Sequence, residues 1–342
     1  MRQARIKIPS GDGPGVYHCV SRVVDRRFIF GVTEMEMFLR FMREYEQFCG
    51  VRVLTYCLMS NHFHVLLEVP QRPKIMPDVE EIMNRLSRLS GAAISEEKAR
   101  KMLAMFEAAK DPRGGAEYLE QFCNRMWDLS SFVKLLKQRF TQWFNRKSGR
   151  KGTLWEDRFK SILVEGEGDA LMTMAAYIDL NPVRAGLVND PAEYRWSGYG
   201  EAMAGRRGAK EGLREIMARA SRATLTTATE ALKAYRLRVF TQGEEGKEGT
   251  DEAGVYLRPG ISRDAVLAVV NAKGRLPAIE YVRCRVRYFC DGAVIGSRKF
   301  VENAFGRFRS LFGERRKSGA RRMRGLNEEL YSARDLRVRV FE

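Results

Sequence analysis

Two apolar segments separated by a turn, within residues 51–69, constrain the fold more than any other feature of the chain. They are VRVLTYCLM (51–59) and HFHVLLEV (62–69), and Ser60 and Asn61 between them belong to residue types that favour turns. Two strands joined by so short a turn pair with each other in antiparallel fashion. The sequence therefore predicts a β-hairpin over 51–69, which Pro70 ends.

The elements predicted around this hairpin come in a recognisable order. Before it lie a strand, GVYHCVSRVV (15–24), and an amphipathic helix, EMEMFLRFMREYEQFC (34–49); after it lie a helix, LSSFVKLLKQRFTQWFNRK (129–147), and a strand, TLWEDRFKSILVE (153–165). The order strand, helix, strand, strand, helix, strand is that of the ferredoxin-like β-α-β-β-α-β unit. We therefore predict an α+β fold in which an antiparallel sheet carries its helices on one face.

Other regions lie outside this unit. Residues 71–128 are charged and rich in Met and predict a helical insertion with breaks near Gly91 and near 111–115. The helix predicted over 168–182 stops at Pro182. The composition then changes, which divides the chain into 1–200, a helical segment and linker over 201–254, and a basic, mostly helical region over 255–342.

The charge of the chain restricts the partners to consider. Sixty Lys and Arg residues stand against 43 Asp and Glu residues, for a net charge of +17. This excess favours a polyanionic partner, nucleic acid before a membrane. We find no apolar run of about 18 residues that could span a membrane. The six cysteines form no C-x-x-C pair, and the N-terminus lacks the apolar stretch of a signal peptide, so we expect reduced thiols and a cytoplasmic protein.

Two of the three histidines, His62 and His64, lie in the second strand of the hairpin. Alternate side chains of a strand share a face, so these two imidazoles point away from Phe63 and Val65 and lie side by side. Such a pair is suited to holding one divalent metal, and two surface histidines on a half-exposed sheet are the alternative. The third histidine, His18, has no such partner and is interpreted as a core or surface residue.

Tyr177 and Asn181 lie four residues apart in the segment AAYIDLNPVRAGLV, so they share a helix face. A tyrosine can act as a covalent nucleophile when a metal polarises and orients a phosphate. Asn181 is a candidate oxygen ligand beside the two imidazoles, in a mixed set compatible with Mg²⁺ or Mn²⁺. A buried aromatic residue on an amphipathic helix is the alternative for Tyr177.

Two segments combine basic and aromatic residues. Residues 134–160 include Trp155, Arg158 and Lys160, and residues 297–325 are still more basic. Cations neutralise phosphates and aromatic rings stack on unpaired bases. A solvated charged face over core aromatics is the alternative for the first segment, and a solvated tail is the alternative for 313–325. DGAVIGSRKFVENAF (291–305) is a candidate small helical DNA-binding element.

Several motifs in order resemble a known family. YHCVSR, LMSNHFHVLLEVP, FNRKSGRKGTLWEDRFKSILVE and YIDLNPVRAGLV followed by PAEYRWSGY occur in the order and spacing of the single-tyrosine HUH transposases. The nearest branch is that of the REP-associated tyrosine transposases, and the likeness covers about 15–70 and 129–200. It implies a catalytic domain over 1–200. The region 255–342 lies outside the likeness, and its basic composition predicts a DNA-binding domain.

The resemblance also implies a mechanism and a set of residues. His62 and His64 match the metal-binding pair with Mg²⁺ or Mn²⁺, Tyr177 matches the catalytic tyrosine, and Asn181 matches a polar metal ligand. The tyrosine would attack single-stranded or hairpin DNA, form a 5′-phosphotyrosine link and release a 3′-hydroxyl, which allows cleavage and joining without ATP. Candidate DNA contacts are Trp155, Arg158, Lys160 and Arg184. Relatives include monomers and dimers, so a homodimer is one expectation.

Two other functions fit the same sequence. A non-catalytic regulator that binds repeated hairpin sequences would need the positive charge but not the set His62, His64 and Tyr177. A protein that acts on structured RNA through the same fold would depend on the 2′-hydroxyl for binding.

Overall fold

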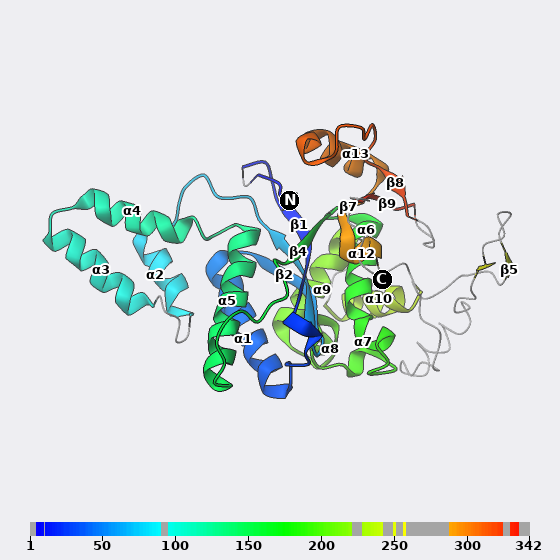
Figure 1. Cartoon of the computed structure of the whole chain (residues 1–342), viewed down its shortest axis with the longest axis horizontal. Helices are drawn as coiled ribbons and strands as arrows, with labels where there is room; N and C mark the ends of the chain where they lie inside the picture. Colours follow the sequence, from blue (N-terminus) through cyan, green and yellow to red (C-terminus); the bar gives the residue numbers. More distant parts are fainter. Residues whose placement is uncertain are drawn as a thin grey trace.

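A mixed sheet forms the centre of the molecule (Figure 1). The computed structural model describes residues 5–9, 11–89, 95–220, 228–241, 249–250, 256–257, 287–323 and 329–334. The first four strands are β1 (Gly15–Arg22), β2 (Arg52–Leu58), β3 (His62–Val69) and β4 (Lys160–Val164). They lie in the order β2-β3-β1-β4 with each neighbouring pair antiparallel. This order is that of a ferredoxin-like unit, so the predicted α+β fold and the hairpin are confirmed.

One face of this sheet is covered by α1 (Val32–Cys49) and α5 (Leu129–Lys147). The rings of Phe38 from α1, Phe63 from β3 and Phe140 from α5 pack together, with Phe38 lying 4.8 Å from Phe63 and 5.3 Å from Phe140 between ring centroids. All three side chains are fully buried. The period-3.6 apolar stripes of the two helices therefore meet the odd-numbered face of β3.

The second face of the sheet also carries helices, and here the prediction of helices on one face was wrong. The helices are α6 (Gly168–Asp179), α8 (Gly198–Met203), α9 (Arg207–Ala220) and α10 (Ala228–Thr241). Figure 1 shows them on the side of the sheet opposite to α1 and α5. Every residue of α6 from Ala170 to Asp179 is buried. A helix that is apolar nearly all round needs partners on both sides, which the sheet and α9 provide.

The helix predicted over 168–182 ends earlier than expected. α6 stops at Asp179, and a short helix, α7 (Asn181–Arg184), follows with Pro182 in its first turn. Proline fits the first turn of a helix, where its missing N–H has no partner to lose. Pro182 therefore begins a new turn instead of only ending the old one.

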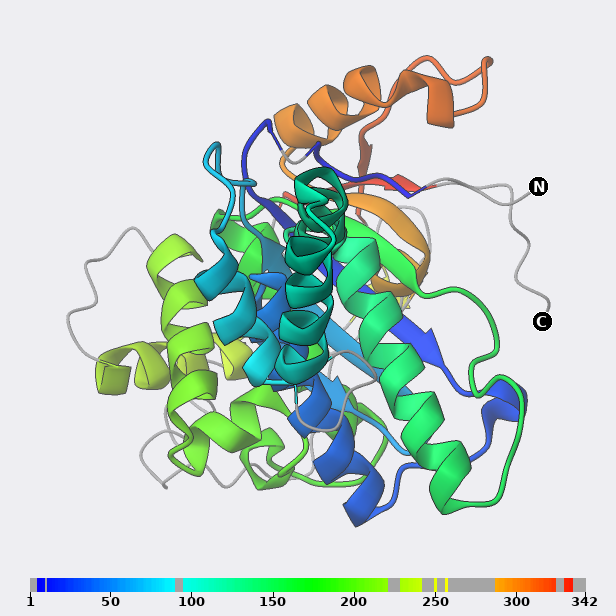
Figure 2. The same ribbon diagram turned by 90° about the vertical axis from the view of Figure 1, so that its left-hand side faces the viewer.

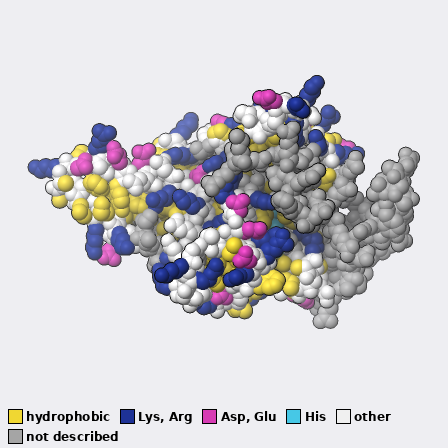
Figure 3. All heavy atoms as spheres, viewed as in Figure 1, with side chains coloured by type: hydrophobic (Ala, Val, Ile, Leu, Met, Phe, Trp, Pro, Cys, Tyr) yellow, Lys and Arg dark blue, Asp and Glu magenta, His cyan; other side chains and the backbone are white. Residues whose placement is uncertain are grey.

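The insertion between β3 and α5 consists of three helices, α2 (Val79–Ser87), α3 (Glu96–Ala108) and α4 (Pro112–Cys123). Figure 2 shows them in front of the layer formed by α1 and α5, and Figure 3 shows hydrophobic side chains gathered on their outer surface. Asp111 caps α4 by accepting a hydrogen bond from the Gly114 N–H. The break expected near 111–115 therefore lies just before Pro112, and the one near Gly91 falls outside the described residues.

The described C-terminal residues extend the same sheet. They form α12 (Arg287–Asp291), β7 (Gly292–Gly296), α13 (Arg298–Arg307), β8 (Arg321–Arg322) and β9 (Tyr331–Arg334). β7 lies parallel to β4, with Leu163 opposite Val294, and the full sheet order is β2-β3-β1-β4-β7-β9-β8. The segment expected to be a helical element over 291–305 is thus a strand followed by a helix. Its first part, GAVIG, is too short and β-branched for a helix.

β5 (Gly249–Thr250) and β6 (Tyr256–Leu257) pair with each other in a separate two-stranded sheet. Most of the linker predicted at 241–254 lies outside the described residues. The division of the chain at residues 200 and 254 stays a prediction. Among the described residues, no helix is both long enough and apolar enough to cross a membrane.

Candidate active site

His62 and His64 point toward the face of the sheet that carries α6. Phe63 and Val65, which alternate with them along β3, lie in the core beneath α1 and α5. The two imidazole rings are 5.1 Å apart between centroids and nearly perpendicular. His62 is partly exposed and His64 is 2% exposed. The alternation of β3 therefore brings the two histidines side by side, as the sequence predicts.

Tyr177 of α6 lies against this histidine pair. Its ring centroid is 5.9 Å from that of His64 and 6.0 Å from that of His18. α6 is positioned by its apolar residues, which pack between the sheet and α9. The structure thus brings together His62, His64 and Tyr177, which come from two elements more than a hundred residues apart in the chain.

His18 is a third histidine of the same site, and sequence reasoning missed it. Its Nε2 lies 2.9 Å from His64 Nδ1, and its Nδ1 lies 2.9 Å from the carbonyl oxygen of Phe289. In the register of β1 and β3, His18 is opposite Leu66, and Val20 is opposite His64. His18 and His64 are therefore diagonal neighbours on one face. The alternation of β1, combined with that pairing, was the signal that could have found it.

Burial keeps all three imidazoles neutral. It lowers the pKa of His18 to about 3 and that of His62 to about 4, and it holds the pKa of His64 well below the usual value. The positive charge of Arg22 lowers the pKa of His62 further, and the charges of Arg184 and Arg22 act on His64 in the same direction. A neutral imidazole is the form that can give a nitrogen lone pair to a metal.

The hydroxyl of Tyr177 is covered by the C-terminal segment. Its oxygen lies 3.2 Å from Cys290 Sγ, and its ring stacks on Phe289 with a centroid distance of 4.3 Å and an interplanar angle of 19°. Only 5% of Tyr177 is exposed. Burial raises the pKa of Tyr177, Cys290 raises it further, and the Arg184 guanidinium opposes both. The tyrosine is therefore protonated in this arrangement.

Asn181 and Arg184 hold each other beside the tyrosine. The amide nitrogen of Asn181 donates to the carbonyl oxygens of Tyr177 and Ile178 at 3.0 and 3.1 Å. Its Oδ1 accepts a hydrogen bond from Arg184 at 2.9 Å, and the Arg184 guanidinium carbon lies 4.0 Å from the centroid of the Tyr177 ring. Because the Asn181 oxygen faces a cation, this arrangement does not support Asn181 as a metal ligand.

The described residues offer no larger cluster for a metal. None of their His, Cys, Asp and Glu side chains form a group of three or more that could hold an ion. The two histidines of β3 therefore supply two ligand positions at most from these residue types. Five of the cysteines, including Cys290 at the site, lie in the described residues as free thiols.

Comparison with known proteins gives a family match for part of the chain. Residues 15–106 match a family model described as transposase IS200 like. This segment of the chain is therefore similar to IS200-like transposases. The matched segment contains His18, His62 and His64, whereas Tyr177 lies beyond it, so the role of Tyr177 depends on the geometry described above.

The chain also has a likeness to a solved structure of a REP-associated tyrosine transposase bound to a REP hairpin. The likeness covers 61% of this chain and 88% of that chain, with 16% identity and a TM-score of 0.38. No curated protein matches the chain.

The residues predicted to contact DNA occupy different environments in the structure. Trp155 is 7% exposed, its indole N–H donates to Thr141 Oγ1 at 2.9 Å, and its ring packs against Phe63 and Phe140. A ring buried in this way is not available to stack on a base, so this arrangement does not support Trp155 as a DNA contact. Its position in a basic segment was the only sequence signal for that role.

Arg158 and Lys160 are exposed, by contrast. Val20 of β1 is opposite both His64 on β3 and Lys160 on β4, so the three residues share one row across the sheet. Side chains in one row point to the same face. Lys160 therefore projects on the face that carries the histidines, two strands from His64.

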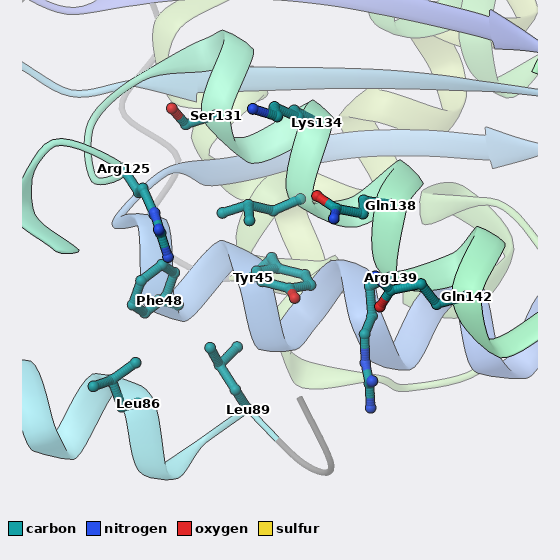
Figure 4. A pocket seen from close by; sticks show the side chains of 11 residues that line it. Tyr45, Phe48, Leu86, Leu89, Arg125, Ser131, Lys134, Gln138, Arg139 and Gln142 are labelled. Carbon is teal, nitrogen blue, oxygen red and sulfur yellow. The ribbon is translucent and has the colours of Figure 1, made fainter. Parts of the chain in front are cut away.

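A pocket on the other face of the sheet is separate from these residues. It has a volume of about 250 Å³ and lies between α1, α2 and α5 (Figure 4). Tyr45 and Phe48 form one wall, and Arg125, Lys134 and Arg139 line the rest. His62, His64, Tyr177 and the individually named DNA-contact candidates do not line it, although Lys134 and Arg139 belong to the basic segment 134–160.

Proposed function

We propose that this protein is a transposase that cleaves and rejoins single-stranded DNA, with Tyr177 as the nucleophile and with Mg²⁺ or Mn²⁺ held by His62 and His64. The observation that carries the proposal is the contact between Tyr177 and His64, whose rings lie 5.9 Å apart between centroids. A nucleophile next to a metal-binding pair can attack a phosphate that the metal orients. Hairpin DNA, rather than unstructured single strands, is the proposed substrate.

The proposed step balances as a phosphoryl transfer. Tyr177 Oη attacks the phosphorus, the bond from phosphorus to the 3′-oxygen breaks, and a bond from phosphorus to Oη forms. The phenol proton leaves to a base in solvent, and the departing 3′-oxygen takes up a proton to become a 3′-hydroxyl. Attack of a second strand's 3′-hydroxyl on the 5′-phosphotyrosine reverses the step and joins the DNA, with no net loss of a phosphodiester bond.

The histidine pair fits a divalent metal as a partial ligand set. Both imidazoles are neutral at neutral pH because burial lowers their pKa values. A divalent ion bound there would neutralise charge on the phosphate and polarise it. Mg²⁺ commonly keeps several waters and uses few protein ligands, so two imidazoles leave positions for phosphate oxygens and water.

The residues around Tyr177 have distinct roles in this proposal. Arg184 lies over the ring and opposes the rise that burial causes in the pKa of Tyr177, so it favours loss of the phenol proton. Lys160 projects on the same face as His64 and is placed to contact a DNA phosphate. Phe289 and Cys290 cover the hydroxyl, so α12 has to move before DNA reaches it.

The test is a search for the covalent intermediate. The protein is incubated with Mn²⁺ and labelled single-stranded oligonucleotides that carry the hairpins flanking its own gene, and denaturing gels are examined for a protein–DNA adduct. We expect an adduct that Tyr177→Phe and EDTA each abolish. Tyr118→Phe is the matched control, because it also removes one phenol hydroxyl, but from α4, away from the site.

The opposite result would favour a different function. Tight binding to several flanking hairpins without an adduct, in both metals, would contradict the enzymatic proposal. It would support a non-catalytic protein that binds repeated hairpins. Matched RNA and DNA hairpins in the same assay separate a DNA substrate from a structured RNA.

A further inference from the structure

We propose that Asn61 and His18 are positioning residues that fix the tautomers of His62 and His64, so that both imidazoles present a bare Nε2 toward the metal site. This inference rests on the proposed metal-binding role of the pair. Neither residue touches the reacting atoms in the proposal. Each acts through the histidine that it contacts.

The orientation of the Asn61 amide determines the tautomer of His62. Asn61 Nδ2 lies 2.9 Å from the carbonyl oxygen of Arg26, which can only accept a hydrogen bond, so the nitrogen of the amide is on that side. Its Oδ1 therefore faces His62 Nδ1 at 2.7 Å. An amide oxygen only accepts, so His62 Nδ1 carries the proton. In a neutral imidazole the other nitrogen, Nε2, then holds a free lone pair.

A second chain of contacts determines the tautomer of His64. The carbonyl oxygen of Phe289 accepts a hydrogen bond from His18 Nδ1 at 2.9 Å, so that nitrogen carries a proton. His18 Nε2 is then the bare nitrogen of a neutral ring and must accept from His64 Nδ1, 2.9 Å away. His64 therefore also carries its proton on Nδ1 and leaves Nε2 bare.

The reverse direction of this second hydrogen bond would need a positively charged His18. That ring is completely buried, and the Arg184 guanidinium lies against the neighbouring Tyr177 ring. Burying an imidazolium that has no carboxylate partner costs on the order of several kcal/mol of folding free energy. The described contacts of His18 are a carbonyl oxygen and two aromatic rings, His64 and Tyr177, and none is an acid.

Both sets of hydrogen bonds place the proton on Nδ1 and leave Nε2 bare, although different residues accept the hydrogen bond. In water a neutral histidine prefers the tautomer with the proton on Nε2, which would block the nitrogen proposed to bind the metal. An acceptor fixed at Nδ1 reverses that preference and also sets the plane of the ring. Asn61 in the hairpin turn and His18 in the neighbouring strand supply that acceptor for one histidine each.

The direct test is an NMR measurement on the unmodified protein. The chain has three histidines, so ¹⁵N-histidine labelling gives three imidazole spin systems. Two-bond ¹⁵N–¹H correlation in EDTA near neutral pH reports which nitrogen of each ring is protonated. We expect Nδ1–H for His18, His62 and His64. An Nε2–H tautomer at His62 or His64 would overturn the proposal.

Variants test the positioning role separately from the fold. Asn61→Leu and His18→Leu remove the acceptors, whereas Asn61→Asp and His18→Gln keep an oxygen that can accept from the neighbouring Nδ1. We expect the Leu variants to weaken Mn²⁺ binding by about 10- to 100-fold, measured by electron paramagnetic resonance of free Mn²⁺, and the conservative variants to restore most of it. Equal Mn²⁺ affinity in all four variants and the wild type would refute the positioning role.

The failure of this inference is distinguishable from that of the proposed function. Tyr177→Phe is expected to keep both tautomers and the Mn²⁺ affinity while losing the DNA adduct. Tautomers as expected without an adduct would leave the positioning role intact and contradict only the enzymatic proposal. An adduct together with the opposite tautomers would contradict only the positioning role.

Discussion

Asp179 offers a stability prediction that depends on one buried carboxyl group. Its side chain is completely buried between α6, β2 and α10. It accepts a hydrogen bond from Thr55 Oγ1 at 2.8 Å and another from the hydroxyl of Tyr235. Burial raises the pKa of Asp179 to about 7, although these hydrogen bonds oppose the rise. The folded protein therefore stores a proton there that the unfolded chain releases.

The sign and the size of the effect follow from linkage. The pKa of the carboxyl is higher in the folded state than its reference value of 3.8, so the folded state binds more protons between pH 4 and pH 7. The free energy of unfolding then falls as the pH rises through this range. About three pKa units correspond to about 4 kcal/mol, and about 3 kcal/mol of this is lost above pH 5.

Asp179→Asn tests this reasoning because an amide keeps the size of the side chain and cannot ionise. The free energy of unfolding is measured by urea unfolding at pH 5 and at pH 8. We expect the difference between the variant and the wild type to shift by about 3 kcal/mol in favour of the variant when the pH is raised from 5 to 8. Asp169→Asn, at the exposed start of the same helix, is the control. Its free energy of unfolding should change between pH 5 and pH 8 as that of the wild type does. Parallel stability curves for Asp179→Asn and the wild type would refute the argument.

Three further predictions concern the site and its surroundings. Phe289→Ala uncovers Tyr177 and should raise the initial rate of adduct formation; an unchanged rate would show that α12 does not limit access. Trp155→Ala should cost about 3 to 5 kcal/mol in unfolding free energy, and a loss of DNA affinity without destabilisation would contradict its core role. Lys160→Ala should weaken binding of single-stranded DNA and reduce the slope of log affinity against log salt by about 0.7, as titrations at several salt concentrations can check.

The fold was predictable where local patterns and topology agree. The hairpin over 51–69 and the amphipathic helices at 34–49 and 129–147 have strong periodicity, and their order leaves few arrangements of the sheet. The helix layer on the second face was not predictable in the same way. The apolar residues of α6 surround the whole helix, so periodicity does not indicate which surface it covers.

In the site, too, the sequence predicts what depends on local pattern and misses what depends on non-local contacts. His62 and His64 follow from alternation within one strand, so the sequence alone predicts that they share a face. His18 joins them only through the pairing of β1 with β3, which is a non-local contact. The covering of Tyr177 by Phe289 and Cys290 depends on a C-terminal segment whose place beside β4 leaves no local signal. The burial of Trp155 was not predictable either, because the charge of neighbouring residues does not indicate whether a ring is buried.

The hydrogen bond between Tyr177 and Cys290 joins residues 113 positions apart, which has a consequence for protein synthesis. A ribosome completes β1 to β4 and α6 long before it makes α12 and β7. Contacts between distant segments also form late because closing a long loop costs entropy. We expect ribosome-bound chains arrested near residue 240 to form the DNA adduct faster than the finished protein, and equal rates would contradict this. The order of translation thus leaves Tyr177 uncovered first and covers it last.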